Sequence, residues 1–121
     1  MIVALHHAQI TVPKGAESEA RKFYCERLGL KEVPKPEVLL ARGGFWIQLG
    51  AIQVHVGTED GVDRRNTKAH LGFEVDDLAK MRALVLGLGL EIIEGEPIPG
   101  LNRFECRDPF GNRMELVQKT C

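Results

Sequence analysis

Apolar and polar residues alternate along several short stretches of the chain, as expected for β-strands that bury one face. Two longer stretches instead carry apolar residues at helical spacing, with Ala20, Phe23, Tyr24 and Leu28 forming one stripe. Each of these helical stretches ends at a glycine that is followed by leucine. The pattern predicts strands over residues 5–12, 38–42, 45–49, 52–56, 70–75, 91–94, 103–108 and 113–118, and helices over 17–28, with Ser18 as the N-cap, and 78–88.

The order of these elements repeats once. A strand with His7 precedes a helix ending at Gly29, and a strand beginning at His70 precedes a helix ending at Gly89. The closing strands match in the same way, Gln53 corresponding to Glu115, and such internal periods indicate duplicated units. We expect an α+β fold of two βαβββ modules that form a cupped mixed sheet with helices on the outer face. The single domain, 1–121, would hold module 1 at about 1–57, a linker at about 57–68 and module 2 at about 69–119.

The strand faces opposite the apolar residues are rich in histidine, glutamine, glutamate and arginine. Buried polar groups cost free energy unless they are paired, so this face is expected to be hydrated or to hold a ligand or a metal. By strand parity His6 falls on the other face and is expected to be structural. The polar face consists of His7, Gln9, Thr11, Gln53, His55, His70, Glu74, Arg103, Glu105, Arg113 and Glu115, with Trp46 and Gln48 as further candidates.

Composition excludes several classes of protein. The chain has 121 residues, 44% of them hydrophobic and 27% charged, which is typical of a globular domain. Its 16 basic and 17 acidic residues give no electrostatic reason to bind nucleic acid. It has no apolar run of membrane-spanning length and no signal-peptide pattern, so we expect a cytoplasmic protein. Cys25, Cys106 and Cys121 form no CxxC pair, which argues against a disulfide framework or a zinc finger.

Four segments carry a family resemblance. They are the first strand with His7, FYCERLGL at 23–30, AHLGFEVDDL at 69–78 and DPFGNRMELV at 108–117. Over nearly its whole length the chain resembles the vicinal oxygen chelate superfamily, the group of glyoxalases, bleomycin resistance proteins and extradiol dioxygenases. The resemblance implies a homodimer and a divalent metal held by His7, His70 and Glu115, with ligands from one chain or from two. Two imidazoles and one carboxylate suit Fe(II), Mn(II), Ni(II) or Zn(II).

The resemblance leaves the activity open. The metal would chelate a small substrate through two neighbouring oxygens and act as a Lewis acid in a lyase, isomerase or ring-opening dioxygenase reaction. Gln53, the possible fourth ligand or a substrate contact, stands where lactoylglutathione-type glyoxalases usually have glutamate. An amide cannot act as a base, so standard glyoxalase I activity is disfavoured and His55 becomes the candidate acid–base residue.

Two other functions stay open at this stage. A fosfomycin-type thiol transferase is disfavoured because little chain follows Glu115, whereas such enzymes usually have further basic residues there. A metal-free protein that sequesters a small toxic compound, as bleomycin resistance proteins do, is the alternative from another class. Whatever the reaction, Arg103 and Arg113 could bind a carboxylate or phosphonate, or could instead pair with Glu105 or Glu74. The expected substrate contacts are Gln9, Trp46, Arg103, Glu105 and Arg113.

Overall fold

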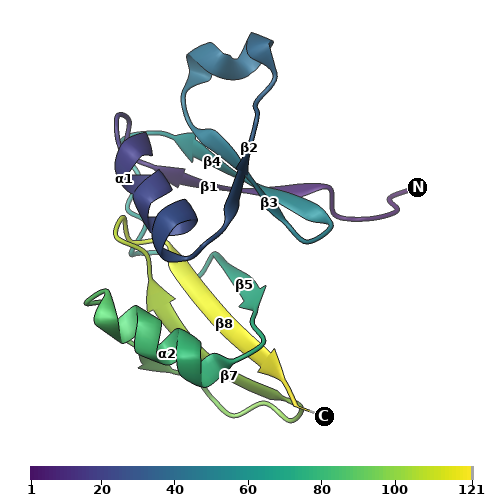
Figure 1. Cartoon of the computed structure of the whole chain (residues 1–121), viewed down its shortest axis with the longest axis vertical. Coiled ribbons are helices and arrows are strands. Elements are labelled where there is room, and N and C mark those ends of the chain that lie inside the picture. Colours follow the sequence, from purple (N-terminus) through teal and green to yellow (C-terminus); the bar gives the residue numbers. More distant parts are fainter. Residues whose placement is uncertain (121) are drawn as a thin grey trace. The chain divides into compact units, whose positions relative to one another are not determined.

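The structure is a computed structural model that describes residues 1–120, so Cys121 lies outside the described residues. The chain divides into two compact units, residues 1–62 and the residues from 63 onward (Figure 1). The first unit contains β1 (His7–Val12), α1 (Glu17–Arg21), the π-helix η1 (Lys22–Arg27), β2 (Lys31–Val33), the 3-10 helix η2 (Glu37–Arg42), β3 (Phe45–Leu49) and β4 (Ile52–Thr58). The second contains β5 (His70–Glu74), α2 (Leu78–Gly87), β6 (Ile93–Glu94), β7 (Leu101–Arg107) and β8 (Arg113–Lys119).

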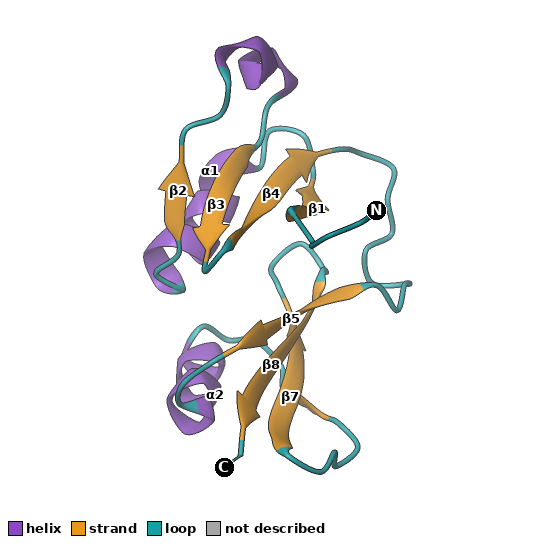
Figure 2. Ribbon diagram, turned by 90° about the vertical axis from the view of Figure 1, so that its right-hand side faces the viewer, coloured by secondary structure: helices purple, strands orange, loops and turns teal. Residues whose placement is uncertain are grey.

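Both units have the same sheet topology. The strand orders are β1-β4-β3-β2 and β5-β8-β7-β6. β1 runs parallel to β4 and β5 parallel to β8, while the remaining pairs are antiparallel (Figure 2). Each unit is therefore one βαβββ module, and the duplication predicted from the sequence is confirmed.

In the first unit, the core lies between the helical segment and one face of the sheet. Phe23 and Tyr24 are buried on the helical side, and Phe45 and Ile47 are buried on β3. The helical segment ends at Gly29, where φ is 74° and the N–H of Leu30 donates to the carbonyl of Tyr24 at 3.0 Å. This turn is the one that the FYCERLGL motif encodes, because only glycine adopts such a φ without strain.

The second unit repeats this arrangement with α2 in place of the first helical segment (Figure 1). The side chain of Asp77 accepts a hydrogen bond from the N–H of Lys80 at 3.0 Å and so caps the start of α2. Leu78 and Val85 of the helix are buried, as are Phe104 on β7 and Leu116 on β8. None of the helices in residues 1–120 has the length and apolarity needed to cross a membrane.

Two predicted segments differ from the structure. Residues 38–42 form part of the 3-10 helix η2 rather than a strand, and their Val38 and Leu40 are exposed. The two edges of β3 are taken by β4 and by β2, a strand that the alternation did not predict, so no edge of β3 remains for this segment. The predicted strand over 91–94 is reduced to Ile93–Glu94, and Ser18 does not cap α1, which starts one residue earlier.

Candidate metal centre and active site

Strand register places the predicted polar residues of the first unit on one face of its sheet. In the parallel pair, His7 lies opposite Gln53 and Gln9 lies opposite His55. In the antiparallel pair, Trp46 lies opposite His55. Directly opposed residues point to the same side of a sheet, so these five side chains share the face away from the helical segment.

His55 is the centre of an aromatic stack on this face. Its ring lies 3.9 Å from that of Trp46, with an interplanar angle of 3°, and 4.3 Å from that of His7, with an angle of 17°. The residue is only 7% exposed, and this burial, together with positive charge on His7, His6 and Lys35, lowers the pKa of His55. His55 is therefore neutral near pH 7.

A hydrogen bond defines which nitrogen of His55 carries the proton. Its Nε2 lies 2.9 Å from Oε1 of Gln53. An amide oxygen only accepts hydrogen bonds, so Nε2 holds the hydrogen and Nδ1 is left with a lone pair. The side chain of Gln53 thus orients His55 as a proton acceptor.

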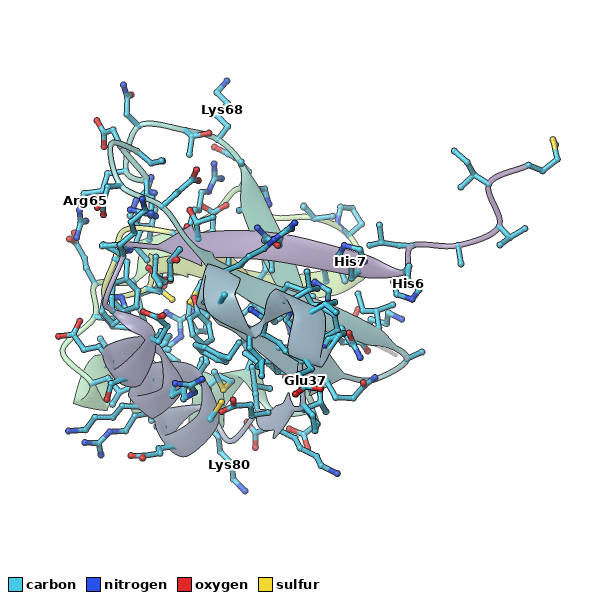
Figure 3. All side chains as sticks on the ribbon, turned by 90° about the horizontal axis from the view of Figure 1, so that it is seen from above. His6, His7, Glu37, Arg65, Lys68 and Lys80 are labelled. Carbon is cyan, nitrogen blue, oxygen red and sulfur yellow. The ribbon has the colours of Figure 1, made fainter. Side chains whose placement is uncertain are left out.

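A pocket of about 500 Å³ opens over this face of the first unit. His6 lines it as well as His7, because β1 begins only at His7 and strand parity does not govern the residue before it. Figure 3 shows the two histidines next to one another at the start of β1. Sequence reasoning also missed Lys35, which precedes η2, and Arg42, the last residue of η2, which was expected to end a strand over 38–42. The lining is His6, His7, Gln9, Lys35, Leu39, Arg42, Gly43, Trp46, His55, Val56, Gly57 and Thr58.

In the second unit, His70 and Glu115 meet on the corresponding face of the sheet. Nε2 of His70 lies 3.1 Å from Oε2 of Glu115, and Nδ1 of His70 lies 2.9 Å from the carbonyl oxygen of Lys68. A carbonyl only accepts, so Nδ1 carries the hydrogen and the lone pair of a neutral His70 faces the carboxylate. A proton or a cation must lie between these two acceptors.

This donor set fits a divalent metal. Metal-binding histidines usually donate their second ring N–H to a carbonyl or carboxylate, as His70 does toward Lys68. The other oxygen of Glu115, Oε1, accepts from Nη1 of Arg103 at 3.0 Å, which leaves Oε2 directed at His70. Within residues 1–120, however, no group of three or more His, Cys, Asp or Glu side chains is placed to hold a metal by itself.

The predicted substrate-binding arginines are engaged with carboxylates of their own sheet. Arg103 contacts Glu115, contacts Glu105 at 3.5 Å and donates to the carbonyl of Glu96 at 3.0 Å. Arg113 binds Glu105 through two hydrogen bonds of 2.8 and 2.6 Å. The bond from Arg113 lowers the pKa of Glu105. Of the two readings left open by the sequence, the structure shows the ion pairs.

The DPFGN motif fixes the position of Glu115. The buried carboxylate of Asp108 accepts from the backbone N–H groups of Phe110 at 2.9 Å and Asn112 at 2.8 Å. This turn joins β7 to β8 and sets their register, in which Glu105 lies opposite Glu115. The motif therefore acts on the site through the strand that it places.

Register also revises one correspondence between the two units. His70 lies opposite Arg113 and Gly72 opposite Glu115, whereas His7 lies opposite Gln53 and Gln9 opposite His55. The position of the first unit that matches Glu115 is therefore His55, and the pairing of Gln53 with Glu115 was wrong. The sequence offsets differ between the halves because the loops differ in length, so the strand pairing was needed to align them.

Comparisons with known proteins agree with the fold. The profile of the Glyoxalase/Bleomycin resistance protein/Dioxygenase superfamily matches residues 4–116. A crystal structure of a Bacillus anthracis protein assigned to the glyoxalase family is 37% identical, with a TM-score of 0.89 over 99% of this chain and 98% of that one.

More distant structures share the fold. The fosfomycin resistance protein FosX from Listeria monocytogenes, solved with Mn(II) and a sulfate ion, is 18% identical, with a TM-score of 0.77 over 99% of this chain and 93% of that one. An integron cassette protein from V. Cholerae is 23% identical, with a TM-score of 0.71 over 99% and 98% of the two chains. No curated protein matches the chain.

Proposed function

Because the chain belongs to the Glyoxalase/Bleomycin resistance protein/Dioxygenase superfamily, we propose that it is a small metal-dependent enzyme. In this proposal His7, His70 and Glu115 bind Fe(II), Mn(II), Ni(II) or Zn(II) together with a substrate that has two neighbouring oxygens. The observation that carries the proposal is the approach of His70 Nε2 to Glu115 Oε2 at 3.1 Å, because two metal-type donors face one another there.

His7 supplies the third ligand in this proposal. It comes either from the same chain as His70 and Glu115 or from a second copy in a homodimer. When bound, a divalent cation would stabilise negative charge that develops on a chelated substrate oxygen.

The proton chemistry falls to His55. Its Nδ1 carries a lone pair, its Nε2 donates to Gln53, and its position matches that of Glu115 in the duplicated unit. An imidazole can take and return a proton where the amide of Gln53 cannot, which removes the argument against glyoxalase-like chemistry. We therefore favour a lyase or isomerase reaction in which Nδ1 of His55 removes a proton from a carbon next to a substrate carbonyl, with ring-opening dioxygenation as the alternative.

A fosfomycin-type reaction is the second candidate. FosX shares the fold, and one of its structures holds Mn(II) with 1S,2S-dihydroxypropylphosphonic acid. The sequence argument against this reaction was the short chain after Glu115. Lys35 and Arg42 weaken that argument, since they supply positive charge at the pocket of the first unit. Turnover of fosfomycin, with thiol or with water as nucleophile, distinguishes this candidate from the first.

Metal content tests the proposal directly. Anaerobically purified protein is analysed by elemental mass spectrometry as wild type, His70→Ala, Glu115→Ala and Glu74→Ala. Glu74 is the matched control, because it lies on the same strand face as His70 but pairs with Lys119 in an exposed position. We expect about one ion per chain in the wild type and the control, and little in the two ligand variants.

Two results would reject a metal site at these residues. One is full occupancy in both ligand variants. The other is an absence of metal from all four proteins together with no binding of Fe(II), Mn(II), Ni(II) or Zn(II) on titration. The second result would favour the metal-free binding protein, and ligand screens would then replace turnover assays.

A further inference from the structure

We propose that the pocket of the first unit is a binding site for a small organic oxyanion, a carboxylate, phosphate or phosphonate attached to an apolar body. The inference rests on the proposed function in one respect, which is that the anion is taken to be part of the enzyme's substrate. The binding itself uses residues of the first unit alone and needs no metal.

The charge of the lining carries the argument. Lys35 and Arg42 both line the pocket and bring two positive charges to it. None of the lining residues is an aspartate or a glutamate. Glu37, the acidic residue that starts η2, is not part of the lining.

These cations also lack a counter-charge within residues 1–120. The arginines of the second sheet, Arg103 and Arg113, are paired with glutamates. By contrast, neither Lys35 nor Arg42 has a carboxylate within ion-pair distance among the described residues. A cationic pocket without its own anion is suited to a ligand that brings one.

The backbone holds Lys35 at the pocket. Its ammonium group donates to the carbonyl oxygen of Gly43 at 2.5 Å, which connects the two ends of the segment that contains η2. This bond uses one of its three N–H donors and leaves its charge uncompensated, because the carbonyl is neutral. The lysine is thus ordered before any ligand arrives, which lowers the entropy cost of binding.

The rest of the lining favours an apolar body on the anion. The ring of Trp46 and the side chain of Leu39 form part of the wall. The volume of about 500 Å³ lies within the range of sites for small organic molecules and exceeds what a bare inorganic ion needs. We therefore expect an aromatic oxyanion to bind more tightly than inorganic phosphate.

Trp46 provides the readout, because it is the only tryptophan of the chain. Protein freed of metal and dialysed is titrated with phenylphosphonate, benzoate, inorganic phosphate and neutral benzyl alcohol, and the tryptophan fluorescence is followed. We expect saturable changes with the two aromatic anions, weaker binding of phosphate, and none with benzyl alcohol. Lys35→Gln combined with Arg42→Gln should raise the Kd for the aromatic anions by roughly tenfold or more, since each lost contact is a charged hydrogen bond.

Two variants serve as controls. Lys31→Gln removes an exposed lysine of the same sheet that does not line the pocket, and it should bind like the wild type. Glu115→Ala removes a proposed metal ligand of the second unit and should also bind the anions normally in metal-free protein. If the wild type takes up no metal but still binds the anions, the proposed metal site is rejected and this inference stands.

Three results would overturn the inference. They are no saturable binding of any of the anions, equal affinity of the double variant and the wild type, and binding of benzyl alcohol as tight as that of phenylphosphonate. The last result would mean that the pocket recognises the ring and not the charge.

Discussion

Replacement of Arg103 by methionine tests the ion network that orients Glu115. Methionine keeps much of the length of the side chain but removes the guanidinium that contacts Glu115, Glu105 and the carbonyl of Glu96. Arg113 would still bind Glu105, but among the described residues Glu115 would retain only His70 as an ion-pair partner. The free energy of unfolding should therefore fall.

The size of the loss follows from burial. The side chains of Arg103, Glu105 and Glu115 are only 14%, 10% and 15% exposed. Removal of one partner from a buried ion pair costs roughly 3–5 kcal/mol. Against this, Nε of Arg103 is buried without a hydrogen-bond partner among the described residues, and losing it relieves a desolvation cost of about 1–3 kcal/mol. We expect a net loss of about 2 kcal/mol.

Urea unfolding of metal-free protein at pH 7, followed by Trp46 fluorescence and by circular dichroism, measures this loss. Lys119→Met is the matched control, because its pair with Glu74 is exposed and should contribute less than about 1 kcal/mol. Added metal should recover part of the stability of Arg103→Met, since a cation beside Glu115 replaces the lost positive charge. If Arg103→Met and Lys119→Met lose the same free energy, the network does not hold Glu115 as described.

Three further predictions concern pH, thiol reactivity and backbone strain. The pKa of Glu105 is lowered by its pair with Arg113, so the pair stabilises the fold fully above the normal carboxyl pKa of about 4.3. This stabilisation is lost as the pH falls through the lower pKa of the folded state. When the urea midpoint of unfolding is measured from pH 3 to 7, Arg113→Met should therefore show a smaller fall at the acidic end than the wild type. Burial raises the pKa of Cys106 to about 11, so Ellman's reagent at pH 8 should leave it unmodified until denaturant is added, and rapid native labelling would contradict its burial. In urea unfolding, Gly44→Ala should lower the free energy of unfolding by several kcal/mol, because the added Cβ would lie 2.2 Å from a backbone oxygen. Gly50 also has a positive φ but faces open space, so Gly50→Ala should cost only about 1–2 kcal/mol. Equal losses in the two variants would refute the clash at Gly44.

Strand parity predicted most of the fold and of the polar faces. Residues two positions apart in a regular strand, such as Gln53 and His55, point to the same face of the sheet, and the structure shows these two on one face. The prediction of a strand failed where the alternating segment has no free strand edge to pair with. Val38 and Leu40 alternate like strand residues, yet they form an exposed 3-10 helix because both edges of β3 are already paired.

The functional groups were predictable to different degrees. His70 and Glu115 lie in motifs of the family, and the structure brings them together at 3.1 Å. The match of His55 with Glu115 depends on register between strands far apart in the sequence, which offsets alone do not give. Lys35 lies outside every predicted element, and Arg42 lies in the segment 38–42 that was predicted as a strand but forms a 3-10 helix, so no pattern in the chain marked them as pocket residues.

The correspondence of His55 with Glu115 has a consequence for how such a chain can evolve. A single βαβββ unit that pairs with its own copy must place the same residue at both equivalent positions, so any mutation there appears twice. Once two units are joined in one gene, each position mutates alone. The second copy can keep a carboxylate, while the first adopts an imidazole, which burial keeps neutral near pH 7 as a proton acceptor. Exchange of residues at these two positions is then the shortest mutational route from one reaction to another on an unchanged fold.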